Sequence, residues 1–96
     1  MNPAWRTAWI TGASQGIGHA LAMQLASGGG VHVAASSRNA ADLQRMHSEN
    51  PHVYPFVLDV TDHEAAGEVV ERMEATLGLP DLVVLNAGTY EPVDAA

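Results

Sequence analysis

Residues 9–18 read Trp9-Ile10-Thr11-Gly12-Ala13-Ser14-Gln15-Gly16-Ile17-Gly18. The apolar residues before Gly12 predict a strand, and the Ala- and Leu-rich residues after Gly18 predict a helix. A glycine-rich turn that leads from a strand into a helix presents unpaired backbone N–H groups to an anion, together with the positive end of the helix dipole. The stretch therefore predicts an anion-binding turn.

The glycine spacing in this turn differs from the commoner G-x-G-x-x-G fingerprint, because Gly12, Gly16 and Gly18 are separated by three residues and then by one. We expect Gly12 to leave the strand through a backbone conformation that a Cβ would disfavour. Gly16 and Gly18 would leave room for a phosphate or for the neighbouring strand. In a unit of this kind the anion is typically the pyrophosphate of a dinucleotide, although a plain glycine loop would have the same composition.

Length and composition fit one small α/β domain over residues 1–96, with residues 1–5 expected to be a flexible leading segment. The formal net charge of −7 argues against nucleic acids and anionic membranes as partners. No apolar run approaches the roughly 20 residues of a membrane span. The chain has no cysteine, which excludes disulfides, and no signal peptide opens it, so we expect a cytoplasmic protein.

The hydrophobic pattern predicts strands that alternate with helices. The expected strands are residues 7–11, 31–36, 53–58 and 82–85, and the expected helices are residues 16–27, 40–47 and 62–77. This alternation is typical of an α/β fold with a Rossmann-like, doubly wound parallel sheet, here four strands in the order 3-2-1-4 with three helices on its two faces. Pro55 places the third strand at a sheet edge, and the unbroken apolar run of residues 82–85 predicts a strand covered on both faces. Ligand binding is expected at the carboxyl ends of the first and fourth strands, where the strand order reverses.

Several segments resemble those of one known family. Thr11-Gly12-Ala13-Ser14-Gln15-Gly16-Ile17-Gly18 is similar to the T-G-x-x-x-G-x-G signature of the short-chain dehydrogenase/reductase family, and further matches follow in register at Ser37-Arg38-Asn39, Leu58-Asp59-Val60-Thr61 and Asn86-Ala87-Gly88. The resemblance covers nearly the whole chain but only the first half of the family's fold. It implies an oxidoreductase that moves hydride between a nicotinamide dinucleotide and a ketone or secondary alcohol.

The resemblance also implies a cofactor site assembled from these segments. The pyrophosphate would lie at Gly12, Ser14, Ile17 and Gly18, with Gln15 in the same loop. The 2′ position of the adenosine ribose would lie at Ser37, Arg38 and Asn39, and the adenine at Asp59 and Val60. The ribose nearer the nicotinamide would lie at Asn86, Ala87 and Gly88.

Arg38 predicts which dinucleotide is preferred. In this architecture an acidic residue at the end of the second strand selects the free 2′-hydroxyl of NAD, whereas here the uncharged Ser37 is followed by Arg38. A guanidinium binds a 2′-phosphate through charge-assisted hydrogen bonds, and Ser37 can add a hydroxyl donor. Because family members with Ser-Arg-Asn at this point generally prefer NADP(H), we predict NADP(H) over NAD(H). Gln15 adds no second positive charge, and an ordinary solvated arginine is the alternative.

Other candidate residues have plainer explanations. Asp59 could cap the following helix instead of meeting the adenine. Asn86-Ala87-Gly88 could be a simple turn, and Leu85 stands where the family has a first asparagine. The five histidines show no metal-ligand spacing, so no metal site is predicted, and Trp9 is expected to be a packing residue.

The family's catalytic residues are missing from these 96 residues. The family uses a tyrosine activated by a lysine four residues later, and a serine, whereas this sequence has Tyr54 and Tyr90 but no lysine. We therefore expect no catalytic residue in this chain and no hydride transfer by it alone. Three explanations remain open: the amino-terminal half of a longer reductase, favoured by the abrupt end at residues 94–96 and the apolar fourth strand; a stand-alone dinucleotide-binding module or sensor; and an interaction domain that binds no nucleotide. The substrate is not identified, and a homo-oligomer is compatible with the sequence.

Overall fold

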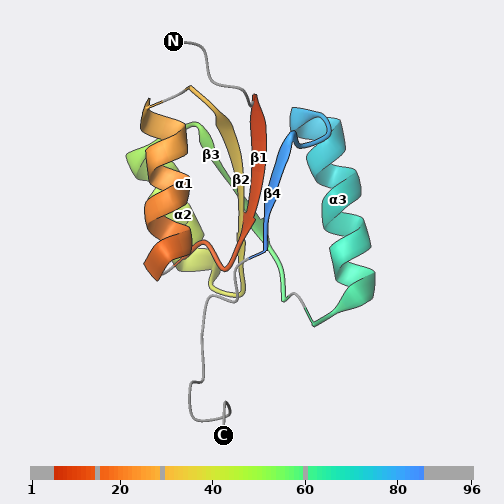
Figure 1. Ribbon diagram of the computed structural model, residues 1–96. Coiled ribbons are helices and arrows are strands. Elements are labelled where there is room, and N and C mark those ends of the chain that lie inside the picture. The colour runs from red at the N-terminus through yellow and green to blue at the C-terminus, as the bar shows by residue number, and fades with distance from the viewer. Residues whose placement is uncertain (1–5, 15, 29, 60, 86–96) are drawn as a thin grey trace, which may run out of the picture.

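The computed structural model describes residues 6–14, 16–28, 30–59 and 61–85 of the chain. Strands and helices alternate in the order β1 (Thr7–Thr11), α1 (Gly16–Gly28), β2 (His32–Ser37), α2 (Ala40–Glu49), β3 (Val53–Val57), α3 (His63–Leu77) and β4 (Leu82–Val84). The strands form one parallel sheet in the order β3-β2-β1-β4 (Figure 1). The doubly wound α/β fold predicted from the sequence is confirmed, and so is the edge position of the strand that contains Pro55.

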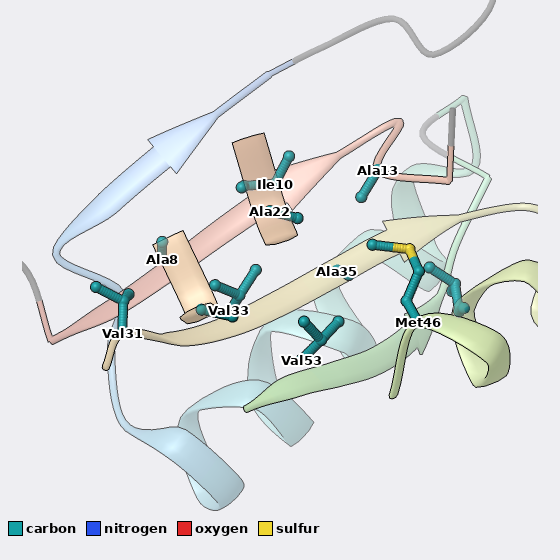
Figure 2. Packing of buried hydrophobic residues seen from close by; sticks show 11 residues of the cluster. Ala8, Ile10, Ala13, Ala22, Val31, Val33, Ala35, Met46 and Val53 are labelled. Carbon is teal, nitrogen blue, oxygen red and sulfur yellow. The ribbon is translucent and has the colours of Figure 1, made fainter. Parts of the chain in front are cut away.

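The helices cover the sheet from both sides, with α1 and α2 on one face and α3 on the other (Figure 1). Because side chains along a strand alternate between the two faces, each face has its own core. The first core joins sheet residues to α1 and α2 and consists of Ala8, Ile10, Ala13, Ala22, Ala26, Val31, Val33, Ala35, Leu43, Met46 and Val53 (Figure 2). The second joins the sheet to α3 and consists of Ala34, Phe56, Leu58, Val69 and Met73.

Helix α1 packs through small residues. Its sequence is apolar on most sides, and its buried positions are Gly18, Ala22 and Ala26, spaced four apart on one stripe. Ile17, by contrast, is 80% exposed. The absence of large side chains on the stripe lets the α1 backbone lie close to β1 and β2.

Capping residues define the ends of helices α2 and α3. The Asn39 side chain accepts a hydrogen bond from the Asp42 amide at the start of α2, and the Asp62 side chain accepts one from the Ala65 amide at the start of α3. Gly78 ends α3 with a positive φ of 87°. Among the helices of the described residues, none has the length and apolarity that a membrane crossing requires.

The observed strands and helices differ from the predicted ones mainly at their ends, by one or two residues. The prediction that the fourth strand is covered on both faces is wrong for the residues described. Leu82 and Val84 are half-buried against the first core, but Val83 is 47% exposed on the other face. The cause is the position of α3, which packs over residues of β2 and β3 and against Trp9.

The Asp81 carboxylate joins the start of β4 to the start of β1. Its Oδ2 accepts hydrogen bonds from the backbone amides of Arg6 (2.8 Å) and Thr7 (3.2 Å), while the Asp81 amide donates to the Thr7 carbonyl (2.8 Å). The Arg6 amide, followed by the Thr7 amide, holds the pKa of Asp81 below its usual value of 3.8. The folded chain therefore favours the ionised carboxylate.

We predict that Asp81→Ala lowers the urea midpoint of unfolding at neutral pH, because two backbone amides lose their acceptor. A lowered carboxyl pKa contributes stability above the usual value of 3.8, and this contribution is lost as the pH falls through the lowered pKa. The difference in urea midpoint between Asp81→Ala and the parent chain should thus become smaller as the pH is lowered from neutral to below 3.8. Urea unfolding at a series of pH values across this range measures it. Glu71→Ala, on the exposed face of α3, is the control. An equal midpoint change for both variants would contradict this role of Asp81.

Candidate cofactor-binding site

The carboxyl ends of all four parallel strands lie at one end of the sheet, and the described turns after β1, β2 and β3 lie at that end (Figure 1). The turn after β1 leads into α1, and the turn after β2 contains Arg38 and Asn39. The turn after β3 contains Leu58 and Asp59. The fold thus brings together the described parts of three of the four segments predicted to bind a cofactor.

The glycine-rich turn after β1 has the backbone geometry expected from its sequence. Gly12 and Gly16 have positive φ angles of 60° and 59°, a region that disfavours residues with a Cβ. A Cβ added at Gly16 would meet no protein atom within 4 Å, so backbone conformation, and not crowding by the protein, requires glycine there. The Ala13 amide donates to the Ser36 carbonyl (3.0 Å), which fixes the turn to the end of β2.

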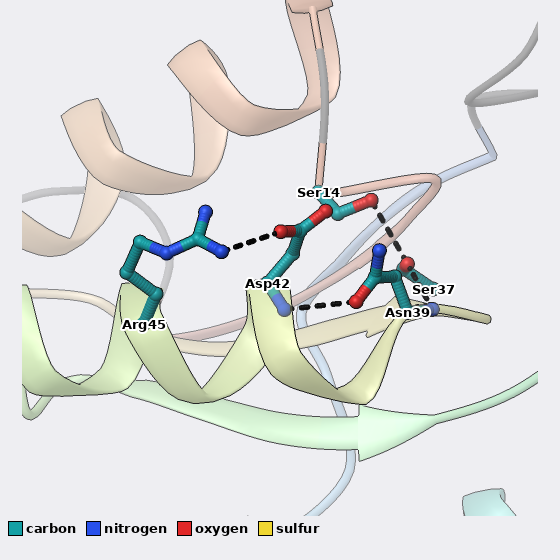
Figure 3. Close-up of polar contacts among 5 residues, drawn as sticks. All are labelled: Ser14, Ser37, Asn39, Asp42 and Arg45. Carbon is teal, nitrogen blue, oxygen red and sulfur yellow. Dashed lines mark hydrogen bonds and ion pairs between the residues drawn. The ribbon is translucent and has the colours of Figure 1, made fainter.

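A hydrogen-bond chain continues from this turn through β2 to α2 (Figure 3). The Ser37 hydroxyl donates to Ser14 Oγ (2.9 Å) and accepts from the Asn39 amide (2.9 Å). Ser37 is only 8% exposed. Since a serine hydroxyl has a single proton, the Ser37 proton is committed to Ser14, and the proton of Ser14 remains available for another acceptor.

The positively charged residues beyond β2 are in different situations. Arg38 is exposed and belongs to no ion pair among the described residues. Arg45 is bound to Asp42 by an ion pair of 3.0 Å within α2 (Figure 3). The Asn39 side chain is used as the cap of α2. Arg38 is therefore the cation of this segment that has no protein counter-ion in the described residues.

Asp59 forms a local turn with Thr61. Its Oδ1 accepts hydrogen bonds from the Thr61 hydroxyl (2.7 Å) and the Thr61 amide (2.9 Å). The hydroxyl bond, then the amide bond and, to a smaller extent, the charge of Arg38 lower the pKa of Asp59. The helix cap of α3 is Asp62, so the alternative in which Asp59 caps this helix is wrong. Asp59 remains an ionised acceptor at neutral pH.

Five of the predicted site residues lie outside the residues that the structure describes: Gln15, Val60, Asn86, Ala87 and Gly88. The others are described. Those that follow or join the carboxyl ends of β1, β2 and β3 are Gly12, Ser14, Gly18, Ser37, Arg38, Asn39 and Asp59, with Asn39 as the cap of α2, and Ile17 lies exposed in the first turn of α1. No group of three or more potential metal ligands occurs in the described part of the chain.

Two polar arrangements were not predicted from the sequence. Trp9 Nε1 donates to Ser36 Oγ (2.9 Å) beneath the turn after β2, which gives this packing residue a polar contact as well. At the opposite end of the sheet the rings of His32 and His52 stack with centroids 5.0 Å apart, and His32 Nδ1 lies 3.3 Å from the Tyr54 hydroxyl. The period-2 alternation places each pair on one face of the sheet, but only the strand register shows that the partners are neighbours.

Comparison with known proteins identifies the family. The family profile for short chain dehydrogenases matches residues 6–96. The 2,3-dihydro-2,3-dihydroxybenzoate dehydrogenase of Bacillus subtilis is 41% identical over 91 residues, which cover 91% of this chain and 34% of that protein. The L-xylulose reductase of Mesocricetus auratus is 40% identical over 84 residues, which cover 88% of this chain and 32% of that protein. The chain thus spans about a third of the length of these relatives.

Solved structures agree with this assignment. Menthone neomenthol reductase from Mentha piperita superposes with a TM-score of 0.77 at 31% identity, over 91% of this chain and 33% of that one. A short chain dehydrogenase/reductase family oxidoreductase from Aeromonas hydrophila superposes with a TM-score of 0.82 at 31% identity, over 88% of this chain and 40% of that one. This chain belongs to the short-chain dehydrogenase family of oxidoreductases.

Proposed function

We propose that this chain is the NADP(H)-binding portion of an oxidoreductase that moves hydride between the nicotinamide and a ketone or secondary alcohol. The observation that carries the proposal is the end of β2, beside the glycine-rich turn: Ser37 is buried and uncharged, and the exposed Arg38 forms no ion pair with another described residue. A dinucleotide fold that selects NAD has an acidic residue at this point. None of the residues from Ser36 to Asn39 is acidic.

The glycine-rich turn fits a pyrophosphate. Gly12 and Gly16 have positive φ angles, and a Cβ added at Gly16 would meet no atom of the described residues within 4 Å, which supports a close approach of a ligand where α1 begins. An anion there would also meet the positive end of the α1 dipole. We propose that Gly12, Ser14, Ile17 and Gly18 receive this part of the cofactor, together with Gln15.

The 2′-phosphate would be recognised by two groups with distinct roles. The Arg38 guanidinium forms no ion pair within the described part of the chain and could make a bidentate, charge-assisted contact with the phosphate. Ser14 has a hydroxyl proton to donate because it already accepts the proton of Ser37. Ser37 would then be a positioning residue that holds Ser14 and the Asn39 amide in place, and Asn39 would act mainly as the cap of α2. This division refines the expectation that Ser37 itself donates to the phosphate.

The adenine would lie against the turn after β3. The ionised Asp59 can accept a hydrogen bond from the exocyclic amino group of adenine while Thr61 fixes its orientation. By family resemblance we assign Val60 to the same pocket, and Asn86, Ala87 and Gly88 to the ribose nearer the nicotinamide.

The residues of this chain would bind and orient the cofactor and would not transfer protons. The bound nicotinamide supplies the hydride. The family's catalytic pair is a tyrosine followed four residues later by a lysine, and the 96 residues contain no lysine. We therefore propose that the carbonyl or alcohol substrate and its proton donor meet the cofactor through residues that these 96 do not include.

We predict that the chain binds NADPH more tightly than NADH, and that Arg38→Ala reduces the affinity for NADPH about 10- to 100-fold, as expected for the loss of a charge-assisted contact. The affinity for NADH should remain unchanged, because NADH has no 2′-phosphate. Isothermal titration calorimetry with both dinucleotides measures this difference.

Arg45→Ala is the charge-matched control, because Arg45 is paired with Asp42 and its side chain is 65% exposed. It should leave both affinities unchanged. Equal affinity of the parent chain for NADPH and NADH, or an equal loss in the two arginine variants, would contradict the proposed role of Arg38. A folded parent chain that bound neither dinucleotide would contradict the proposed function itself.

We predict separate effects for the two serines. Ser37→Ala leaves the Asn39 amide and Ser14 without their partner, and should lower the free energy of unfolding by about 1–2 kcal/mol. Ser14→Ala should change the unfolding free energy less and reduce NADPH affinity more than NADH affinity. Urea unfolding and calorimetric titration measure the two effects, and Ser37→Thr, which keeps the hydroxyl, should restore most of the stability. Ser14→Ala binding NADPH like the parent would show that Ser14 does not contact the 2′-phosphate.

A further inference from the structure

Strand β3 forms one edge of the sheet, so one side of its backbone has no neighbouring strand among the residues that the structure describes. On its inner side, the Val33 amide donates to the His52 carbonyl (2.8 Å) and the Leu58 amide donates to the Ser37 carbonyl (2.9 Å). In a parallel ladder, residues bonded to the neighbouring strand alternate with residues whose backbone groups turn away from it. The residues that turn away, in register with Val33, Ala35 and Ser37, are Val53, Pro55 and Val57.

Both outward groups of Val53 are already bonded within the chain. The Val53 amide donates to the Asn50 carbonyl (3.0 Å). The Val53 carbonyl lies 2.7 Å from Nδ1 of His47, at the end of α2. Since a carbonyl oxygen only accepts, the imidazole is the donor in this contact. A strand approaching this edge would find no free hydrogen-bonding group at Val53.

The next outward position is Pro55, in the middle of β3. Proline has no backbone N–H and cannot donate to a partner strand. The outward groups that remain are the carbonyl of Pro55 and the backbone of Val57. The other residues of β3 are Val, Tyr, Phe and Val, which strongly favour strand pairing. The sequence of β3 is therefore well suited to intermolecular pairing except at the one residue that removes a donor.

We propose that His47, Asn50 and Pro55 form an edge block that prevents β3 from pairing with a second copy of this chain. A second copy is the relevant partner because every copy presents the same apolar, β-branched and aromatic strand, and exposed edges of this kind associate readily. Val57, at the carboxyl end of the strand, is 47% exposed, and its backbone would add to the pairing between two copies if the edge block were absent. This inference does not depend on the proposed cofactor.

The edge block is tested by opening it in the 96-residue chain. Pro55→Val restores an outward N–H, and His47→Ala frees the Val53 carbonyl. The chain that carries both substitutions is the opened variant. Because the chain has no cysteine, Val57→Cys introduces a unique thiol at this edge, and a bis-maleimide reagent then captures copies paired through β3. We expect about tenfold more cross-linked dimer when the opened variant carries Val57→Cys than when the parent chain carries it, because backbone hydrogen bonds become available between copies.

Two controls separate this edge from other contacts. The first control is the double variant Pro55→Val, His63→Ala, which has the same types of substitution as the opened variant. His63 is an exposed residue at the start of α3, so this control keeps the contact between His47 and the Val53 carbonyl. It should cross-link less than the opened variant. Val83→Cys places the reporter thiol on β4, at the opposite edge, where opening β3 should leave cross-linking unchanged. Cross-linking at Val57→Cys that is equal in the parent and the opened variant, or an increase confined to Val83→Cys, would overturn the proposal.

Amide hydrogen exchange of the parent chain gives a second test that holds even if the opened variant does not fold. The amides of Val53, bonded to Asn50, and Phe56, directed toward β2, should exchange at least about tenfold more slowly than the amide of Val57. Equal protection of Val57 and Phe56 would show that the edge is already paired. Rapid exchange at Val53 would show that its outward N–H is free, and either result would overturn the edge block.

Discussion

The attachment of the glycine-rich turn to the end of β2 is the contact on which the candidate cofactor site depends. The Ala13 amide is bonded to the Ser36 carbonyl, and the next residue along each segment adds the bond between Ser14 and Ser37. These two bonds hold the turn that would meet a pyrophosphate against the strand end that would distinguish one dinucleotide from another. Both bonds follow directly after Gly12, whose positive φ directs the chain out of β1, so they help to fix where α1 begins. Parallel pairing of β1 with β2 brings the two segments together, because it places Thr11 opposite Ser36.

The sequence predicted the fold well because its pattern is repeated consistently. Each of the first three strands is followed by a turn and an amphipathic or small-residue helix, and a right-handed crossover between parallel strands leaves few alternative topologies. Pro55 correctly indicated an edge strand, since a missing N–H is tolerated there. The fourth strand was misjudged because an apolar run shows what a strand can bury but not which helix covers it. That depends on where α3 packs, which is a tertiary property.

The residues of the candidate site could be predicted more readily than their roles. Spacing alone placed Ser37, Arg38 and Asp59 after their strands, but it could not show that the Ser37 proton is directed to Ser14 or that Thr61 engages Asp59. The contact between Trp9 and Ser36 and the stacked histidines depend on register between strands that are distant in the sequence. Periodicity assigns a side chain to a face of the sheet, whereas hydrogen-bond partners depend on distances within that face.

The stripe of Gly18, Ala22 and Ala26 on α1 links the packing of this helix to the position of its amino terminus at the candidate site. With only hydrogen or methyl side chains at the contact, no rotamer change can absorb an added group. A larger side chain at Ala26, near the carboxyl end of α1, would push that end away from the sheet and tilt the helix as one unit. Its amino terminus and the aligned peptide dipoles would then shift away from the turn at Gly12. A steric defect about two helical turns from Gly18 would thus weaken the binding of the pyrophosphate that we propose at this turn.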